Sequence, residues 1–203
     1  IDDFENDSEL VEAALDFNPE YKVRLDVNGG WSLEAALLNL YNYYLRFGKV
    51  FEYIEQPCLD IADLKKLKKE IPMKIAVDES IRKALTSDFA DAKDFADVAI
   101  IKWAPSGGIT RANKLIEKIG LPAVISSALD TGIGISHGLA LAASQNQQNF
   151  DCGLATISLL ESDVVAPAIE ITAGTIAVGR RTPDDKLVAK YTATAERRFW
   201  WQN

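Results

Sequence analysis

Six short apolar runs recur along the chain at nearly constant intervals, and a segment with helical periodicity separates most of them. The runs end 23 to 29 residues apart, at Asp26, Glu55, Asp78, Lys102, Ser126 and Gly153. Strands that alternate with helices form parallel β–α–β units, and strands that are apolar throughout are covered on both faces. A repeating unit of this length is typical of a (β/α) barrel of about 250 residues.

An open, doubly wound sheet is the alternative arrangement of the same elements. Such sheets usually carry a glycine-rich G-x-G-x-x-G loop after the first strand. Only Gly29-Gly30 follows the first run here, and it does not fit that motif. The barrel is therefore favoured.

Hydrophobic periodicity and element-ending residues place the individual elements. Helices are expected at residues 8–17, 32–47, 60–70, 86–93, 109–119 and 134–144, and strands at 23–27, 50–55, 74–78, 98–102, 123–126 and 152–155. Beyond residue 165 three short extended pieces are expected, at 169–173, 175–178 and 187–190. The sequence thus predicts a barrel over residues 1–165 and a C-terminal segment, 166–203, that packs on the barrel or on a second domain.

The composition narrows the classes of function. The 203 residues are 48% hydrophobic and carry a net charge of −8, with one short lysine cluster at residues 65–69. Proteins that bind nucleic acid show a larger basic patch, so we expect no nucleic-acid partner. No apolar run approaches the roughly 18 residues of a membrane span, and no signal peptide is seen. We therefore expect no membrane partner and a cytoplasmic location.

Three successive runs end in a carboxylate, and the fourth ends in a lysine. In a (β/α) barrel the residues at the carboxyl ends of the strands meet at one mouth. Asp26, Glu55 and Asp78 would repel one another there unless a cation neutralised them. Oxygen ligands of this kind suit Mg²⁺, with Mn²⁺ as the alternative. The competing interpretation is that the carboxylates pair with lysines or cap the following helices.

The alternation of side chains along a strand extends this set of candidates. Arg24 and Asn28 share a face with Asp26, so Asn28 could orient the metal ligands and Arg24 could bind an anionic substrate. Of Asp78 and Glu79 only one can point inward, and we expect Asp78 to do so and Glu79 to face outward or to cap the following helix. A substrate carboxylate is expected near Ser127, because Gly132 and Gly134 precede a helix whose first N–H groups are unpaired, with Gly153 allowing close approach. The alternative is that Ser126 and Ser127 only satisfy local backbone groups.

Four segments carry a family resemblance: residues 24–28 (RLDVN), 53–57 (YIEQP), 77–80 (VDES) and 100–103 (IIKW). Together and in this order they resemble the successive strand ends of the enolase superfamily. Residues 124–132 (VISSALDTG), 152–156 (CGLAT) and 160–164 (LESDV) are similar to one branch in particular, the o-succinylbenzoate synthases of actinobacterial type. The resemblance covers roughly residues 21–167.

The resemblance implies a (β/α)7β barrel, in which residues 1–165 run from the helix after the second strand to the eighth strand. It implies that a capping domain and the first barrel strands precede Ile1, together with a second catalytic lysine. Asp26, Glu55 and Asp78 would be the Mg²⁺ ligands, and Lys102 would be a catalytic lysine. The expected partner is a small dicarboxylate substrate, and the expected state is a monomer.

The implied reaction is the syn-dehydration of 2-succinyl-6-hydroxy-2,4-cyclohexadiene-1-carboxylate to o-succinylbenzoate, in menaquinone biosynthesis. It would proceed through an enediolate that Mg²⁺ stabilises. Other members of the superfamily stay open as alternatives: N-acylamino acid racemases, dipeptide epimerases and cycloisomerases. A barrel that binds a metal or ligand without catalysis is a further alternative if the second lysine is missing.

Overall fold

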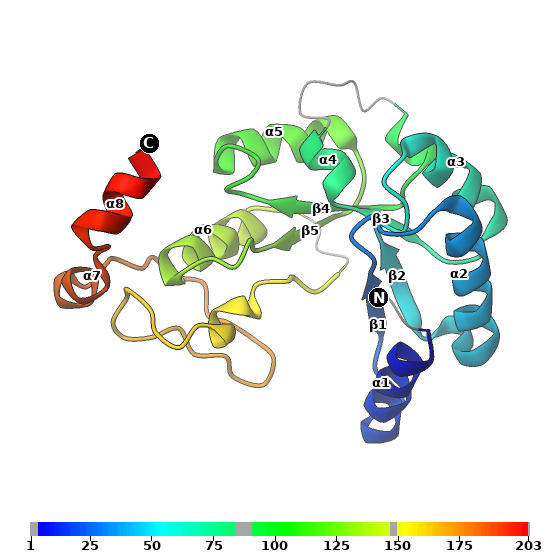
Figure 1. Ribbon diagram of the computed structural model, residues 1–203, viewed down its shortest axis with the longest axis horizontal. Helices are drawn as coiled ribbons and strands as arrows, with labels where there is room; N and C mark the ends of the chain where they lie inside the picture. The colour runs from blue at the N-terminus through cyan, green and yellow to red at the C-terminus, as the bar shows by residue number, and fades with distance from the viewer. Residues whose placement is uncertain (1–3, 84–90, 147–149, 203) are drawn as a thin grey trace.

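A curved sheet of five parallel strands forms the centre of the protein, which is described here from a computed structural model covering residues 4–83, 91–146 and 150–202. The strands are β1 (Val23–Asp26), β2 (Phe51–Glu55), β3 (Ile75–Val77), β4 (Val98–Lys102) and β5 (Ala123–Ser126), and they pair in the order of the chain. Sequential parallel pairing with a helix in most crossovers is the arrangement of a barrel wall. The predicted α/β barrel topology is confirmed as a half-barrel (Figure 1).

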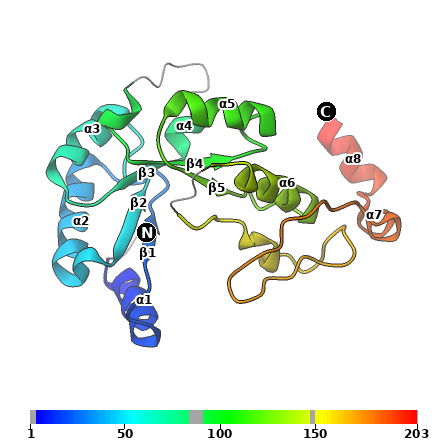
Figure 2. The ribbon, with the colours of Figure 1, turned by 180° about the vertical axis from the view of Figure 1, so that it is seen from behind.

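The helices pack outside this curve. The α-helices of the barrel part are α1 (Phe4–Phe17), α2 (Leu33–Phe47), α3 (Ile61–Glu70), α4 (Glu79–Lys83), α5 (Ile109–Ile119) and α6 (Gly132–Ala143). Short 3-10 turns occupy Gly48–Val50, Ala92–Asp94 and Ala155–Leu159. Seen from behind, α2, α3, α5 and α6 follow one another around the outer face of the strands (Figure 2). The inner face is left facing the barrel axis.

Alternation along the strands separates two hydrophobic clusters. Residues such as Leu25, Ile54 and Ile101 point outward and join the large core beneath the helices. The inward positions form a smaller cluster of Tyr53, Ala76, Val98, Ile100 and Val124, against which Phe150 packs. This inner layer closes the floor of the barrel below the strand ends.

Local capping explains why the helices begin and end where they do. Ser32 accepts a hydrogen bond from the N–H of Ala35 and starts α2, and Asp60 accepts from Ala62 and starts α3. Gly120 ends α5 in the left-handed conformation (φ 64°), which a residue with a Cβ adopts only at a cost. These boundaries agree with the predicted ones within a few residues.

Three predicted elements differ from the structure or fall outside it. The strand expected at 152–155 is reduced to a single bridge between Ser126 and Gly153, because the chain turns at Leu154 into the 3-10 turn Ala155–Leu159. The extended piece expected at 187–190 is instead part of α7 (Asp185–Tyr191), which Asp184 caps. Most of the helix expected at 86–93 lies outside the described residues.

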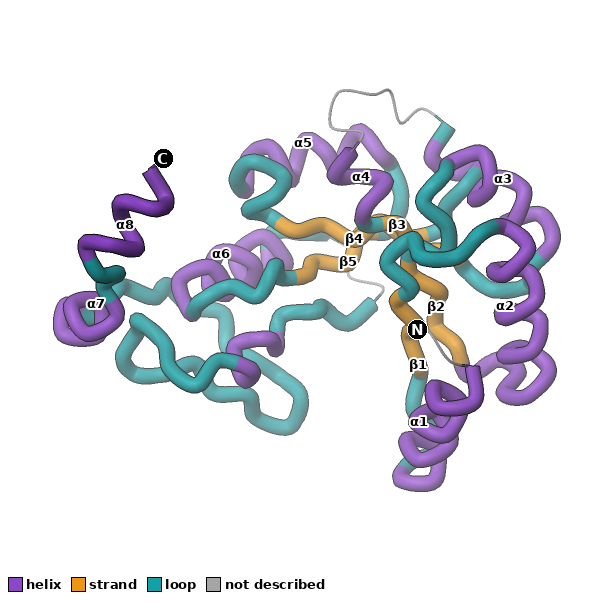
Figure 3. The backbone as a smooth tube through the Cα atoms, in the orientation of Figure 1, coloured by secondary structure: helices purple, strands orange, loops and turns teal. Residues whose placement is uncertain are grey.

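The C-terminal segment leaves the sheet. It passes beside α6, makes a tight turn bridged between Thr172 and Thr175, and ends in α7 and α8 (Ala195–Gln202), far from the strands (Figure 3). Within the described part of the chain, every helix is too short or too polar to cross a membrane.

Candidate active site

The predicted mouth residues lie at one edge of the sheet. Asp26 and Glu55 are register partners at the ends of β1 and β2, and Lys102 and Ser126 are partners at the ends of β4 and β5. Asp78 directly follows β3. Alternation places all of them on the inner side, because Glu55 follows the inward Tyr53 by two residues and Lys102 follows the inward Ile100 by two.

Asp78 is the most deeply buried of these carboxylates, with a side chain only 1% exposed. Lys102 Nζ donates to its Oδ2 at 2.6 Å, and Arg82 Nε lies 3.3 Å from its Oδ1. Oδ1 of Asp78 is buried. Because the Arg82 contact is an ion pair without hydrogen-bond geometry, this oxygen receives no hydrogen bond. A buried carboxylate oxygen in this state can accept a further cation.

Glu55 carries the electrostatic signature of the site. Burial is the main reason that its pKa rises from 4.5 to about 8, and the negative charges of Asp26 and Asp78 raise it further, while Lys102 opposes them. The three carboxylates are therefore close enough to interact strongly. Such a group favours either a proton or a metal cation.

Asn28 lies beside Asp26, as the alternation predicted. It has a positive φ of 51°, which folds the loop back so that its N–H donates to Asp26 Oδ1 and its Nδ2 to Asp26 Oδ2, both at 2.9 Å. Asn is one of the residues that tolerate this conformation. The position of Asn28 thus fixes the orientation of the Asp26 carboxylate.

Glu79 begins α4 but does not face outward. Its Oε1 lies 3.5 Å from Asn28 Nδ2 and 2.8 Å from Arg82 Nη2, and its charge also raises the pKa of Glu55. The reason is local: α4 begins at Glu79, so the two-residue alternation of a strand no longer applies after Asp78. Arg82, which sequence reasoning missed, follows at the i,i+3 and i,i+4 spacings that let helix side chains meet.

The donor chemistry of the mouth suits a hard divalent cation. Three carboxylates, one with a buried oxygen that lacks a donor, provide the oxygen ligands that Mg²⁺ uses. Among the described residues no three such side chains are already drawn together in metal-binding geometry. Asp78 is turned toward Lys102 and Asp26 toward Asn28, so binding a cation would require these carboxylates to shift their contacts.

Arg24 shares the inner face with Asp26 but lies one layer deeper. Its guanidinium pairs with Glu52 at 2.6 Å, donates to the carbonyl of Asp151 at 2.9 Å, and stacks 4.9 Å above the Tyr53 ring. These contacts hold it at the floor of the barrel. The structure gives it no contact with Asp26, Glu55 or Asp78 among the described residues.

The start of α6 is already occupied by a protein carboxylate. Asp163 accepts the N–H of Gly132 at 3.0 and 3.1 Å, and also the N–H of Val164. A Cβ on Gly132 would lie 2.3 Å from Asp163 Oδ2, so only glycine allows this approach. The expectation that the first N–H of this helix is unpaired is wrong for Gly132.

Ser127 is likewise engaged locally. It is 6% exposed, and its Oγ lies 2.6 Å from Thr156 Oγ1 and 3.3 Å from the carbonyl of Gly153. Gly153 lies against the inward Ser126, whose Oγ would be 2.9 Å from a Cβ at position 153. The structure brings Ser126, Ser127 and Gly153 together, as predicted, with Ser126 in the strand position that faces the mouth.

Removing the carboxylate that caps α6 should destabilise the protein. Asp163→Ala is expected to lower the free energy of unfolding by about 0.5–2 kcal/mol, the usual range for loss of a helix cap. Urea unfolding measures the change, and Glu161→Ala, at an exposed neighbouring position, is the control. Equal stability of the two variants would show that Asp163 does not stabilise the helix.

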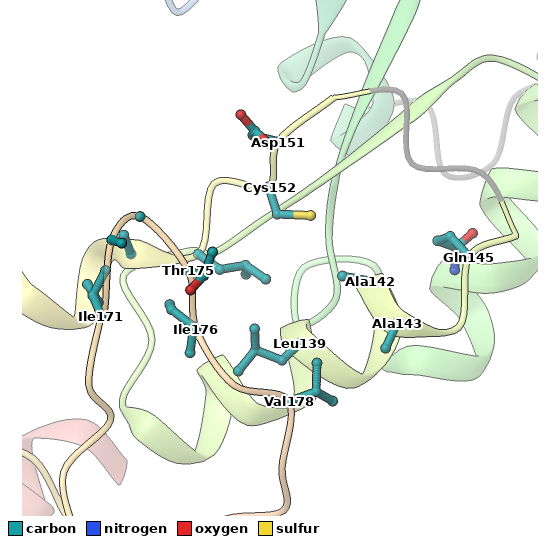
Figure 4. A pocket seen from close by; sticks show the side chains of 14 residues that line it. Leu139, Ala142, Ala143, Gln145, Asp151, Cys152, Ile171, Thr175, Ile176 and Val178 are labelled. Carbon is teal, nitrogen blue, oxygen red and sulfur yellow. The ribbon is translucent and has the colours of Figure 1, made fainter.

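A cavity among the described residues lies away from the mouth. It measures about 760 Å³ and is lined by α6, residues 151–155 and the C-terminal segment 171–178. Figure 4 shows Leu139 of α6 and Ile176 and Val178 of that segment around it. Asp26, Glu55, Asp78 and Lys102 do not line this cavity, so it is separate from the candidate active site.

Comparison with known proteins identifies the family to which this half-barrel is similar. Residues 1–183 match the family model described as Enolase C-terminal domain-like. The chain is 39% identical to proteins named o-succinylbenzoate synthase from Mycobacterium tuberculosis (strain ATCC 25618 / H37Rv) and Mycobacterium ulcerans (strain Agy99). Each comparison covers 97% of this chain, but 59% and 58% of those proteins. The chain thus spans under two thirds of the length of these relatives.

Solved structures give the same result for the fold. The muconate lactonizing enzyme from Pseudomonas putida has a TM-score of 0.80 at 22% identity, over 94% of this chain and 55% of that one. The L-Ala-D/L-Glu epimerase from Bacillus subtilis has a TM-score of 0.66 at 27% identity, over 80% and 46%. By its family model and its half-barrel of parallel strands, the chain belongs to the enolase C-terminal domain-like family.

Proposed function

We propose that this protein is an o-succinylbenzoate synthase, which removes water from 2-succinyl-6-hydroxy-2,4-cyclohexadiene-1-carboxylate to form o-succinylbenzoate for menaquinone biosynthesis. The observation that carries the proposal is the 39% identity, over 97% of the chain, to proteins of that name. The activity is proposed for the whole protein, because the chain spans 59% of those relatives. We also propose a cytoplasmic monomer.

Mg²⁺, or Mn²⁺ in its place, is the proposed cofactor, with Asp26, Glu55 and Asp78 as its ligands and Asn28 orienting Asp26. The support is the mutual repulsion of these carboxylates and the buried Asp78 oxygen without a donor. When bound, a divalent cation would stabilise the negative charge that develops on a substrate carboxylate as its α-proton leaves. Asp26, Glu55 and Asp78 would hold this cation on the side of the mouth that faces Lys102.

Lys102 is the proposed catalytic residue on this face of the substrate. Its side chain is 20% exposed and its ammonium reaches the mouth beside Asp78. In a dehydration it would remain protonated and hold the ring-derived anion by its charge and by a cation–π contact. Proton removal and hydroxyl departure would take place on the opposite face, as the resemblance implies.

Three further residues near the strand ends are proposed to contact the substrate. Gly153 is one of them, because it pairs with Ser126 at the end of β5 and has no side chain between its main chain and the mouth. Arg24 and Ser127 are the other two proposed substrate-binding residues. Their polar atoms bond to protein groups here, so each would exchange one of these contacts for the substrate. The C-terminal segment 166–203 is proposed to pack on the barrel or on a capping domain.

An epimerase or racemase of the same family is the second candidate. It is favoured by the 27% identity to the L-Ala-D/L-Glu epimerase over 80% of this chain. Against it, dipeptide epimerases typically carry Asp-x-Asp at the eighth strand, where this chain has Cys152-Gly-Leu-Ala. A cycloisomerase or a non-catalytic metal-binding barrel would differ in producing no o-succinylbenzoate.

The direct test is conversion of the cyclohexadiene substrate by the intact, full-length protein. We expect an NMR assay to show o-succinylbenzoate with Mg²⁺ present, loss of turnover in EDTA and recovery when Mg²⁺ is restored. Unchanged substrate, with folded protein and bound Mg²⁺, would refute the synthase assignment.

The raised pKa of Glu55 makes metal binding dependent on pH. The carboxyl is protonated at pH 7 without metal, since its pKa lies near 8, and a ligand must be ionised to bind Mg²⁺. We therefore expect the Mg²⁺ affinity to rise about tenfold per pH unit up to pH 8 and to level off above it. Calorimetry in buffers of different ionisation enthalpy should detect about one released proton at pH 7.

In the absence of metal, the raised pKa of Glu55 makes the folded protein less stable as the pH rises, whereas the Mg²⁺ affinity increases with pH. A carboxyl whose pKa is raised on folding stabilises the folded state at pH values below its unfolded pKa of 4.5, and this contribution is lost as the pH rises through about 8.

For metal binding, a Mg²⁺ affinity that does not change between pH 6 and 8 would contradict the assignment of Glu55 as a ligand.

A further inference from the structure

Gln56 is a fully buried polar side chain directly beside the proposed ligand Glu55. Its Nε2 donates to the carbonyl of Cys58 at 2.8 Å and to Ser80 Oγ at 2.7 Å. Its Oε1 accepts the N–H groups of Asp78 at 3.0 Å and of Ser80 at 3.1 Å. An amide can donate two hydrogen bonds and accept two, so this side chain uses its full capacity.

The backbone of Gln56 makes matching connections. Its N–H donates to the carbonyl of Ala76 at 2.8 Å, and its carbonyl accepts the N–H of Gly29 at 2.7 Å. Gln56 has a positive φ of 38°, an uncommon conformation for a residue with a side chain. A strained, fully bonded residue persists where its surroundings require its position.

These bonds join the three strand ends that carry the carboxylates. Gly29 follows Asn28, which holds Asp26, and Asp78 receives its main-chain bond from the Gln56 side chain. Glu55 is the preceding residue of the chain. Gln56 therefore fixes two distances: the distance between β2 and the main chain of Asp78, and the distance between β2 and the loop that follows β1.

We propose that Gln56 is a positioning residue that fixes the spacing of Asp26, Glu55 and Asp78, so that one divalent cation can bind all three. This inference rests on the metal site proposed above. If Gln56 were only structural, replacing it would destabilise the fold, but it would lower the Mg²⁺ affinity no more than replacing another hydrogen-bonded amide. Gln56 differs because its side-chain oxygen holds a ligand residue by the main chain.

The test compares two glutamines in the intact protein. Gln56→Met keeps the length of the side chain but leaves the N–H groups of Asp78 and Ser80 without an acceptor. Gln145→Met is the control, because the partly buried Gln145 also uses its amide, bonding Asn113 Oδ1 at 2.8 Å and the carbonyl of Leu141 at 3.0 Å near the end of α6. Gln56→Asn, which keeps a shorter amide, covers the case in which Gln56→Met does not fold.

Two readouts are measured: Mg²⁺ affinity by calorimetry, and hydrogen exchange of the Asp78 and Ser80 amides. We expect Gln56→Met to weaken Mg²⁺ binding about 10- to 100-fold, the usual loss when a group that orients a ligand is removed. Amide exchange at Asp78 and Ser80 should quicken at least about tenfold, because the two N–H groups lose their acceptor. Gln56→Asn should change both quantities in the same direction, and Gln145→Met should leave both as in the wild type.

The outcomes separate this inference from the proposed function. If wild type binds Mg²⁺ and the Gln56 variants bind it as tightly as Gln145→Met does, Gln56 has no positioning role. If the two amides exchange at the wild-type rate in the Gln56 variants, the inference fails as well. If wild-type protein binds no Mg²⁺, the metal site itself is wrong, and the inference falls with it.

Discussion

Replacing Glu55 by Gln is expected to abolish Mg²⁺-dependent dehydration and to leave the protein folded. The amide keeps the shape of the side chain but removes the charge of one of three proposed ligands. A metal ion contributes several kcal/mol to stabilising the developing charge, and each 1.36 kcal/mol corresponds to a factor of about ten in rate. We therefore expect kcat/KM to fall by roughly 1,000-fold or more.

Glu55→Gln is expected to abolish activity but not to destabilise the protein when no metal is bound. Because the pKa of Glu55 is raised to about 8 by burial and by Asp26 and Asp78, ionising it opposes folding when no metal is bound. Glu55→Gln should therefore be at least as stable as wild type in EDTA above pH 8, as measured by thermal unfolding. Glu117→Gln, at an exposed position on α5, is the control for both measurements. Undiminished turnover and metal affinity in Glu55→Gln would exclude Glu55 as a ligand.

Lys102 gives the second large effect and separates a synthase from a racemase. Lys102→Ala removes the ammonium that lies 2.6 Å from Asp78 Oδ2 and leaves that buried carboxylate without its closest cation. We expect dehydration to fall at least about 1,000-fold, since the site loses a charge that faces the developing anion. Lys102→Arg keeps the charge but cannot act as a base, because a guanidinium stays protonated.

The two variants should therefore differ. A synthase needs only the charge of Lys102, so Lys102→Arg should retain measurable dehydration above the level of Lys102→Ala, with some loss because the guanidinium is larger. Neither variant should exchange the α-proton of the substrate with solvent deuterium on that face. If both variants are equally inactive, and wild type exchanges the α-proton from both faces, Lys102 acts as a base and the function is racemisation or epimerisation.

The spacing of apolar runs predicted most of the fold because parallel strands and their crossover helices have a characteristic length. β4, β5 and α5 have their predicted bounds, and Ser32, Asp60 and Gly120 mark helix ends by their own chemistry. Residues 187–190 were assigned wrongly because a short apolar run fits a helix and a strand equally well. Asp184, which accepts the N–H groups of Lys186 and Leu187, was the available signal for a helix.

The site was predicted less completely than the fold. Strand alternation brought Asp26, Glu55, Asp78 and Lys102 to one edge, but it could not place Glu79, whose direction depends on where β3 gives way to α4. The protein carboxylate at the start of α6 comes from Asp163, 31 residues beyond Gly132. A contact of this separation is decided by packing after the chain has turned, and no local pattern signals it. The role of Gln56 could not be predicted for the same reason, since its partner Asp78 follows β3 and its partner Ser80 lies in α4.

The proposed mechanism requires that Asp26, Glu55 and Asp78 hold a single divalent cation opposite Lys102. A crystal structure of the intact protein with Mg²⁺ and o-succinylbenzoate would test it. We expect one metal ion at about 2.0–2.1 Å from an oxygen of each of Asp26, Glu55 and Asp78, with a product carboxylate beside it and the Lys102 ammonium against the ring. A metal held by other residues, or a product bound away from Lys102 while these carboxylates keep their contacts to Asn28 and Arg82, would contradict it.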